Sequence, residues 1–449
     1  MRVGVIGGGA GGLAAAYELM KRGHVAHVYE RAPFLGGQAS TFEVGGGQLE
    51  RGYHHLFMSD THMVDLIHEL GLGPKLAWIE SKVGFFHGDK IWKFTSPMDL
   101  LGFKPLGLFD RLRLGLVTFY LQKVQKGLRY ENVTAAEWLQ KRVGKKAYEV
   151  VWEPMLRGKF GEHYQEISMV WIWKKINLRV SSRGKPWEKE KLGYPMDSFG
   201  EIFDTLGERI REMGGEVHLS SGVRRVVVED GRATGLEVEL PGGEPEVVPY
   251  DAVIATTPSY VFTKLVPPMP EEYARRLTDV TYLAAVLMVL VLKRPLSGMY
   301  WLNVADRSMP FVGVIEQTNL VDPSLYGGKH VVYLSNYPGT QDRLYKMSGE
   351  ELLEEFLPHL RRINPDFDRS WIEEHHHHRV DAAQPIIGVN YSQRIPDLRT
   401  PIKGVYLANT TQVYPEDRGT NYSVKLGKQV VDLVLEDLGG DQETDGGSR

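Results

Sequence analysis

The glycine-rich run close to the N-terminus has the composition and spacing of a loop that binds phosphate. It consists of residues 7–12 and contains Gly7, Gly8, Gly9, Ala10, Gly11 and Gly12. The first glycine of such a loop allows a tight turn, the second lets the backbone approach a pyrophosphate, and the third lets the following helix pack closely. Glu30 follows at the distance of an acid that accepts hydrogen bonds from a ribose. The pattern predicts a dinucleotide with its phosphates at a helix N-terminus.

Two adjacent histidines, His54 and His55, are the candidates for proton transfer. They follow Gly52 and Tyr53 in the chain. Because an imidazole titrates near neutral pH, either side chain could act as a base or donate a hydrogen bond to a substrate. The sequence therefore predicts that catalytic proton transfer involves one of these two histidines.

The segments around the glycine run have the order of a nucleotide-binding unit. Residues 3–6 form an apolar run that predicts a strand, residues 13–22 have a helix-like composition, and residues 25–29 predict a second strand. The order strand, glycine loop, helix, strand and acid is that of a dinucleotide-binding βαβ unit. The fold class is therefore predicted as α/β, with a Rossmann-like domain.

A pair of glycines a short distance after Glu30 indicates which dinucleotide is bound. The segment contains Arg31, Gly36, Gly37 and Gln38. It resembles FAD-binding folds of the glutathione-reductase type, in which the chain passes close to the phosphates of the flavin. An NAD-only dehydrogenase would not need this pair, so the resemblance implies FAD. Gln38 stands where an Arg or Lys often assists the pyrophosphate, so backbone amides are expected to make more of the phosphate contacts.

The C-terminal region predicts a return of the chain to the cofactor. Residues 403–408 predict a buried strand, residues 409–418 a polar loop, and the residues from there to about 438 an amphipathic helix. This arrangement resembles the C-terminal flavin motif of the superfamily of amine oxidases, protoporphyrinogen oxidases and phytoene desaturases. The resemblance implies a second helix N-terminus beneath the flavin ring, where it helps to stabilise negative charge.

The resemblance also implies which residues hold FAD. In relatives, a stretch like the one at Gly52 brings backbone and a polar side chain to the flavin. The implied contacts are Gly7, Gly9, Ala10, Gly11, Gly12, Glu30, Arg31, Gly36, Gly37, Gln38, Gly52, Tyr53, Val223, Thr256, Asn409, Gly419, Thr420 and Asn421. No metal site is predicted, because the four consecutive histidines at 375–378 cannot all face one ion; a solvated strand end or loop is expected there.

The flavin-like segments predict a discontinuous FAD-binding domain made of residues 1–72, 195–260 and 398–438. The intervening residues, 73–194 and 261–397, are predicted to form an inserted substrate domain of mixed α+β structure. Residues 439–449 contain no apolar side chain and are predicted to be a disordered tail.

Departures from the family narrow the predicted reaction. Flavin amine oxidases usually have a lysine near flavin N5, and that position falls near Leu287, inside an apolar run. An aromatic pair that would hold an amine is also missing, since Gly419 stands where one ring is expected. These differences favour removal of a hydride from a hydrophobic or cyclic substrate. Because no second glycine loop follows, O2 or a quinone is expected to reoxidise the flavin.

Two alternative functions stay open. The polar and aromatic loop at 414–422 and the segment at 53–55 are similar to galactopyranose mutases, which would imply a nucleotide-sugar or lipid-linked-sugar substrate. The same fold occurs in Rab escort and dissociation-inhibitor proteins, which bind prenylated partners without redox chemistry. This non-enzymatic alternative is disfavoured, because those proteins have lost the FAD site whereas Gly7, Gly9 and Glu30 remain here.

Positive charge is concentrated in one region. Residues 104–191 hold 19 Lys or Arg against 9 Asp or Glu, a net charge of +10 in a chain whose total is −4. Residues 106–130 show an amphipathic helical pattern with interleaved basic residues, which could lie on an anionic membrane surface. A core-facing helix with a solvated basic face is the favoured interpretation. A phosphate-bearing substrate is a third, because the basic run continues through Arg157, Lys159, Lys174 and Lys175.

Composition excludes several other classes. The chain has no cysteine, which excludes disulfides, thiolate metal sites, a redox-active dithiol and a cysteinyl-linked flavin. The net charge gives no reason to expect nucleic acid as a partner. The longest apolar run, residues 283–292, is shorter than the roughly 20 residues that span a bilayer and predicts a buried strand. We expect a cytoplasmic enzyme with a small, hydrophobic or anionic substrate and, at most, peripheral membrane contact.

Overall fold

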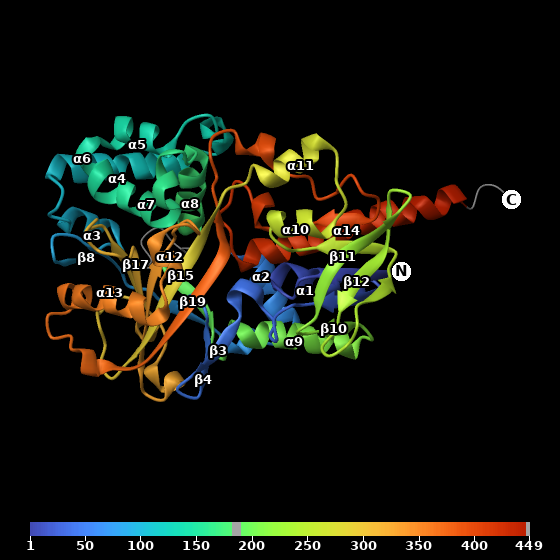
Figure 1. Cartoon of the computed structure of the whole chain (residues 1–449). Coiled ribbons are helices and arrows are strands. Elements are labelled where there is room, and N and C mark those ends of the chain that lie inside the picture. Colours follow the sequence, from blue (N-terminus) through green and yellow to red (C-terminus); the bar gives the residue numbers. More distant parts are fainter. Residues whose placement is uncertain (182–189, 446–449) are drawn as a thin grey trace.

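The computed structural model describes residues 1–181 and 190–445, which form two halves side by side (Figure 1). One half contains a parallel sheet and both ends of the chain, and the other contains a large, mainly antiparallel sheet beneath a layer of helices. The fold is therefore mixed α/β, as the sequence predicts.

A five-stranded parallel sheet is the centre of the first half. In spatial order its strands are β10 (Glu216–His218), β2 (Val25–Tyr29), β1 (Arg2–Ile6), β14 (Ala252–Ala255) and β20 (Val405–Leu407). The three central strands are almost entirely buried, as expected for a parallel sheet covered on both faces. The strands predicted at residues 3–6, 25–29 and 403–408 are confirmed.

Helices pack around the glycine loop on this sheet. The helix α1 (Ala10–Lys21) contacts both α9 (Ser198–Glu212) and the C-terminal helix α14 (Thr420–Asp445), and α2 (Thr61–Glu69) also packs on α14. Gly427 allows the close approach of α14, because a Cβ there would lie 2.4 Å from the carbonyl oxygen of Gly11. The C-terminal helix thus returns to the glycine loop, as the sequence predicts.

Smaller sheets flank the parallel sheet. One consists of β11 (Gly222–Glu229), β12 (Arg232–Glu239) and β13 (Glu246–Pro249), and its apolar side chains pack with those of β14. Another pairs β3 (Thr41–Val44) with β4 (Gly47–Glu50), and a third has the order β5 (Leu56–Phe57), β9 (Lys191–Pro195) and β6 (Leu76–Glu80). The helices α10 (Ser259–Leu265) and α11 (Glu271–Thr278) follow β14.

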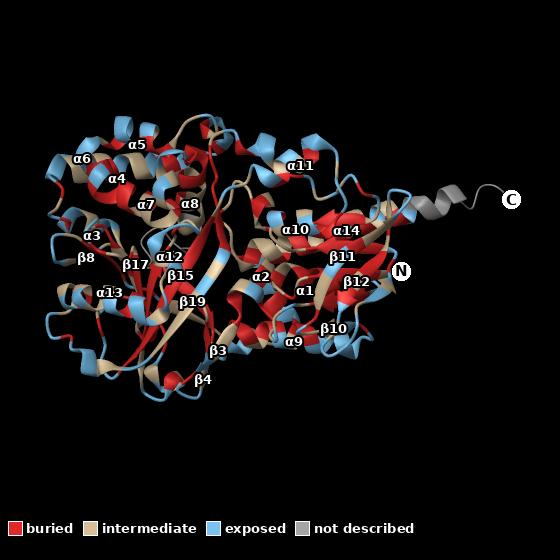
Figure 2. Cartoon of the chain, in the orientation of Figure 1, coloured by how far each residue is buried: buried red, intermediate tan, exposed pale blue. Residues whose placement is uncertain are grey.

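The second half is built on a seven-stranded sheet. Its order is β19 (Ile372–Pro385), β15 (Tyr282–Leu292), β18 (His330–Asn336), β17 (Gly313–Glu316), β16 (Trp301–Val304), β7 (Val83–Phe86) and β8 (Ile91–Lys93). All pairs are antiparallel except β16 with β7. The strand predicted at residues 283–292 is confirmed, since β15 is buried from Leu283 to Leu292 (Figure 2). The helices α12 (Arg343–Lys346) and α13 (Gly349–Ile363) pack beside it.

A group of helices forms the outer edge of this half (Figure 1). It contains α3 (Pro97–Gly102), α4 (Leu108–Lys123), α5 (Ala135–Val143), α6 (Lys145–Ala147), α7 (Glu153–Phe160) and α8 (Met169–Ser181). Their buried side chains form one apolar cluster around Trp152, Phe160 and Trp171. The tryptophans at 152 and 171 therefore belong mainly to the core.

The interpretation of residues 106–130 as a core-facing helix holds for one narrow stripe of the segment and is wrong for most of its apolar side chains. Helix α4 ends at Lys123, and within it only Leu114 and Leu121 are buried. Its other large apolar side chains are exposed, including Phe109 at 74% and Leu116 at 69%. The neighbouring helices cover one narrow stripe of α4, and a helix that is apolar around most of its circumference does not indicate which stripe will be covered.

One further expectation, for the histidine run, is corrected. The histidines at 375–378 lie within β19, paired with β15, rather than at a solvated strand end or loop. His376 and His378 point to the same side of the sheet, and both contact the ring of Phe42. The helix α14 extends to Asp445, into the segment 439–449 that the sequence predicts to be a disordered tail, and residues 446–449 lie outside the described part. Extending an existing helix requires no new nucleation.

Candidate active site

The glycine loop turns sharply between β1 and α1. Gly7 has a φ of +109°, and a Cβ on Gly12 would lie 2.0 Å from the carbonyl oxygen of Gly7. Thr256, just after β14, lies beside the loop and donates from its Oγ1 to the carbonyl of Ile6 at 3.0 Å. Only glycine fits at 7 and 12, so the first turn of α1 begins directly at the loop.

The glycine pair at 36 and 37 lies against this loop. The N–H of Gly36 donates to the carbonyl of Gly8 at 2.9 Å, and a Cβ on Gly37 would lie 3.2 Å from the Cα of Gly9. Within the described part of the chain, a Cβ on Gly9 would meet nothing nearer than 3.8 Å. Backbone without side chains therefore surrounds open space at the N-terminus of α1, which is the environment a pyrophosphate needs.

Glu30 lies at the end of β2, next to the glycine loop. Its Oε2 accepts from the N–H of Gly8 and its Oε1 from the N–H of Ala32, both at 2.7 Å. Two backbone amides thus hold the carboxylate beside the glycine loop. Arg31 is exposed, and Val223 is half-buried on β11.

Two asparagines predicted to contact the cofactor also anchor the fold. The side chain of Asn409 donates to the carbonyl of Thr257 at 2.9 Å and caps the short turn that follows it. Asn421 accepts from the N–H of Met63 at 3.0 Å, which ties α14 to α2. Both side chains are buried, so each fixes the return of the chain towards the glycine loop.

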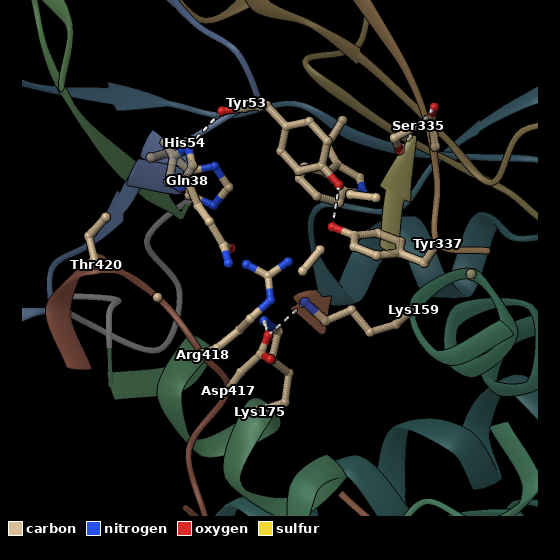
Figure 3. Close-up of a pocket in the computed structure, with 18 of the residues that line it drawn as sticks. Gln38, Tyr53, His54, Lys159, Lys175, Ser335, Tyr337, Asp417, Arg418 and Thr420 are labelled. Carbon is tan, nitrogen blue, oxygen red and sulfur yellow. Dashed lines mark hydrogen bonds and ion pairs between the residues drawn. The ribbon is translucent and has the colours of Figure 1, made fainter. Parts of the chain in front are cut away.

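A cavity of about 270 Å³ lies between the two halves (Figure 3). It is lined by residues 52–55, by α7 and α8, by strands β15 to β19, and by the N-terminus of α14 with the loop before it. Eight predicted site residues line it: Gln38, Gly52, Tyr53, His54, His55, Gly419, Thr420 and Asn421. The cavity therefore brings together the candidate histidines and the C-terminal flavin motif.

Both histidines are neutral at physiological pH. Burial lowers the pKa of His54 to about 4 and that of His55 to about 3. His54 Nδ1 lies 2.6 Å from the carbonyl oxygen of Gly52, and a carbonyl only accepts, so Nδ1 carries the proton and Nε2 has the lone pair. His55 Nδ1 lies 2.9 Å from the hydroxyl of the fully buried Tyr300. His54 is therefore the better candidate for a proton acceptor.

The strand β4 and a buried carboxyl group hold this segment in place. Glu50 accepts from the hydroxyl of Tyr194 at 2.9 Å and from the N–H of Phe199 at 2.8 Å, and its own carbonyl accepts from the hydroxyl of Tyr333. Burial raises the pKa of Glu50 to about 7. These bonds fix the chain just before Gly52 and so position the histidines that follow.

Two tyrosines that line the cavity contact each other through their hydroxyl groups. The hydroxyls of Tyr53 and Tyr337 are 3.0 Å apart (Figure 3). Burial alone would raise the pKa of Tyr337, but Lys159 and Arg418 outweigh burial and lower that pKa. Tyr337 was not predicted as a site residue, because it follows β18 in the sequence and only the packing of β18 against the segment at Glu50 and Tyr53 brings it to Tyr53.

Charged side chains from distant segments meet at the same cavity. Lys175 of α8 and Lys159 of α7 approach the Oδ2 of Asp417 at 2.7 and 3.3 Å. Burial alone would raise the pKa of Asp417, but the two ammonium groups hold it well below its usual range. Of the basic residues singled out in the sequence, Lys174 instead pairs with Glu416, and Arg157 does not line this cavity.

One group of possible metal ligands lies elsewhere among the described residues. His27, Glu216 and His218 bring three ligand atoms within 4.8 Å of one another at the edge of the parallel sheet. The carboxylate of Glu216 lies 3.1 Å from His27 and 2.8 Å from His218. None of the three lines the cavity.

Comparison with known proteins identifies the class of this fold and site. A family model described as flavin containing amine oxidoreductase matches residues 10–416, and the chain belongs to this family. It is an FAD-dependent oxidoreductase, as the sequence predicts. The open backbone cradle at Gly9 and Gly37 and the acid at Glu30 fit this cofactor, because the dinucleotide phosphates need side-chain-free amides and the ribose needs an acceptor.

The most informative relatives differ in their chemistry. A 15-cis-phytoene desaturase from an Oncidium hybrid cultivar is 25% identical over 99% of this chain and 81% of its own length. A putative protoporphyrinogen oxidase from Exiguobacterium sp. 255-15 has a similar structure, with a TM-score of 0.77, 20% identity and coverage of 97% and 99%. Reduced UDP-galactopyranose mutase gives a TM-score of 0.73 at 15% identity, covering 97% and 95%. These structures share the fold of this chain.

Proposed function

We propose that the enzyme removes a hydride from a hydrophobic or cyclic organic molecule and transfers it to FAD. The cavity is the observation that supports this proposal. It is lined by His54, by the N-terminus of α14 and by the apolar side chains of Leu287 and Trp301. Leu287 lines the cavity at the position where amine oxidases usually have a lysine, which disfavours amine oxidation. The names of the desaturase and protoporphyrinogen oxidase relatives agree with such a substrate.

The proposed FAD contacts follow from where the predicted residues lie. Glu30 binds the adenosine ribose, the backbone of the loop at Gly9 and Gly37 binds the pyrophosphate, and α14 presents its N-terminus at Thr420 to the flavin ring. The positive end of a helix dipole favours negative charge nearby. The discontinuous domain predicted from residues 1–72, 195–260 and 398–438 contains all five strands of the parallel sheet, which supports this assignment.

The residues of the cavity have distinct proposed roles. FAD, when bound, supplies the two-electron acceptor. His54 accepts a proton through Nε2, because its Nδ1–H is held by the carbonyl of Gly52 and its low pKa keeps the ring unprotonated. Apolar walls such as Leu287 and Trp301 exclude water and position the substrate.

NADH and NADPH are not expected to reduce the bound flavin, whereas O2 or a quinone is expected to reoxidise it. The sequence has one glycine loop of the dinucleotide type and no second one downstream. The measurement is the absorbance of the bound flavin under anaerobic conditions, first with each nicotinamide and then with fractionated lipids and metabolites. Chemical reduction with dithionite, followed by O2 or quinone, is the control. Rapid stoichiometric bleaching by NADH alone would contradict the proposal.

A sugar mutase is the second candidate. The cationic side chains of the cavity and the structural similarity to UDP-galactopyranose mutase favour it. Such an enzyme would rearrange its substrate with no net consumption of an electron acceptor. Product formation without O2 or quinone consumption would therefore support the mutase, and stoichiometric consumption would support the oxidoreductase that we favour.

We further propose that the cytoplasmic enzyme docks on an anionic membrane surface through α3, α4 and the turn that follows. Within the described residues no helix has both the length and the apolarity to cross a bilayer. Exposed large apolar side chains instead gather on this outer face: Met98, Leu101, Leu108, Phe109, Leu112, Leu116, Phe119, Tyr120 and Leu128. A contiguous apolar patch on a protein surface marks an interaction site.

The positive charge of this segment favours an anionic membrane as the surface that it contacts. Residues 98–130 contain six Lys or Arg and two Asp or Glu, so the segment that carries the apolar side chains has a net positive charge. Each Lys or Arg near an anionic bilayer contributes about 1 kcal/mol, and salt screens that attraction. The apolar side chains would enter the boundary of the acyl chains, as in other interfacial helices.

Replacing Phe109 and Leu116 together by serine is expected to weaken liposome binding by roughly 100-fold or more, because each buried apolar side chain contributes about 1.5–3 kcal/mol. The measurement is co-sedimentation with anionic liposomes at low and rising salt. Val247, which is 56% exposed on β13, gives the matched control Val247→Ser with unchanged binding. Absence of sedimentation at low salt would refute membrane docking, and a concentration-dependent dimer lost in the serine variant would assign the face to a second copy.

A further inference from the structure

The cavity carries more positive than negative charge. Besides Arg179, which has a partner of its own, the described lining includes three cationic side chains, Lys159, Lys175 and Arg418, and two carboxyl side chains, Asp60 and Asp417. Burial raises the pKa of Asp60 to about 6, so this carboxyl group is still largely ionised at neutral pH, and one positive charge remains in excess. A buried surplus of positive charge is unfavourable unless a ligand or partner supplies the opposite charge.

Lys159 and Lys175 form ion pairs with Asp417, whereas Arg418 bonds to a different residue. Asp417 pairs with Lys175 at 2.7 Å and with Lys159 at 3.3 Å, so one carboxylate is shared by two ammonium groups. Arg418 donates only its Nε, to the Oε1 of Gln384 at 3.0 Å. Asp417 therefore balances one of these three charges.

The terminal nitrogens of Arg418 are directed into the cavity (Figure 3). They make no hydrogen bond or ion pair with the part of the chain that the structure describes. Figure 3 shows the guanidinium between Gln38 and Lys159, and the charges of Lys159 and Arg418 both lower the pKa of Tyr337. A guanidinium presents its N–H groups as a planar fork that matches a carboxylate or a phosphate, and Lys159 adds a point charge beside it.

We propose that Arg418 and Lys159 form an anion-binding subsite, and that the substrate is an apolar molecule carrying a carboxylate or phosphate group. The proposal rests on the proposed function in so far as the ligand of this cavity is the substrate. The apolar walls at Leu287 and Trp301 take the body of the molecule, and the cationic end takes its charged group. The anionic end thereby fixes which part of the substrate lies beside Tyr53 and His54.

The phosphates of FAD do not account for this subsite. The cradle for a pyrophosphate lies at the glycine loop, which does not line the cavity. Lys159 and Lys175 come from α7 and α8, in the half of the molecule that contains the large antiparallel sheet. The cationic groups are therefore placed for a second ligand.

Binding to the FAD-loaded enzyme can be measured by the change in flavin absorbance during titration with three probes. The probes are hexanoate, inorganic pyrophosphate and the neutral analogue hexan-1-ol. At least one anion is expected to bind ten times more tightly than hexan-1-ol, with an affinity that falls as salt rises. Preference for hexanoate identifies a carboxylate substrate, and preference for pyrophosphate identifies a phosphate substrate.

Two variants test the residues separately. Arg418→Gln leaves both Asp417 ion pairs intact, and Lys159→Gln leaves the pair with Lys175. Each is expected to weaken anion binding at least tenfold with unchanged FAD content and unchanged binding of hexan-1-ol. Lys174→Gln, next to Lys175 but paired with Glu416, is the matched control and should bind like the wild type.

Anions that bind no more tightly than hexan-1-ol would overturn the subsite, and so would wild-type anion affinity in both variants. The readout requires no turnover. If no organic substrate bleaches the flavin but the variants still lose anion binding, the proposed oxidation fails and the subsite stands. If a neutral apolar substrate bleaches the flavin while anions do not bind, the subsite fails and the oxidoreductase function stands.

Discussion

Replacing Gly9 by alanine is expected to give a folded protein that loses FAD affinity by on the order of 100-fold, about 2.7 kcal/mol. Gly9 has a φ of −81° and a ψ of 179°, which alanine adopts without strain. A Cβ there would meet nothing nearer than 3.8 Å in the described protein, yet it would occupy the open space of the pyrophosphate cradle. FAD affinity is measured by flavin fluorescence during titration of the apoprotein, and folding by thermal unfolding of the apoprotein.

The Gly12→Ala variant is expected to destabilise the fold itself, in contrast to Gly9→Ala. A Cβ at this position would lie 2.0 Å from the carbonyl oxygen of Gly7, so the backbone of β1 and α1 must shift. The apoprotein itself is expected to lose about 3 kcal/mol or more of its free energy of unfolding, at the upper end of the cost of overpacking. Gly339→Ala, where a Cβ meets no atom of the described residues within 4 Å, is the neutral control. Wild-type FAD affinity in Gly9→Ala would refute the cradle.

Asp417→Asn is expected to lower the free energy of unfolding by roughly 3 kcal/mol at neutral pH. Loss of one partner from a buried ion pair costs about 3–5 kcal/mol, and the lower end applies because Lys159 and Lys175 still reach the cavity. The pKa of Asp417 is depressed in the folded state, so its contribution is present at neutral pH. As the pH falls below about 4, the unfolded carboxylate takes up a proton and the difference between variant and wild type shrinks.

Urea unfolding of both proteins across this pH range measures the effect. Glu416→Gln is the matched control, since Glu416 is the neighbouring residue and its ion pair within the described residues is with Lys174. It should cost less than Asp417→Asn. Equal stability of wild type and Asp417→Asn at neutral pH would show that the buried charges are compensated in another way.

The parts of the molecule that could be predicted from sequence are those with local patterns. The glycine loop, the strand on each side of α1 and the acid at Glu30 lie within thirty residues, so their spacing is visible directly. The pair at Gly36 and Gly37 was also visible, although its packing on Gly8 and Gly9 was not. The C-terminal motif could be recognised because a short apolar run, a polar loop and an amphipathic helix follow one another.

The cavity could be predicted only in part, because its residues meet through long-range packing. Lys159, Tyr337 and Asp417 come from three distant segments, and no spacing in the sequence indicates that they share one wall. The exposed face of α4 was missed for a related reason. A helical pattern shows which residues are apolar, whereas the positions of neighbouring helices decide which of them are covered.

The central strand pairing of the nucleotide-binding half delays cofactor capture during synthesis. β1 lies beside β14, with Val3 opposite Ala252, and α14 begins only at Thr420. At about 5–20 residues per second, the first strand waits for tens of seconds on the ribosome before β14 is made. Such distant pairings also slow folding, since the intervening chain must be ordered before they form. We therefore expect flavin to bind only after β14 and α14 have been made, because both elements complete the nucleotide-binding half.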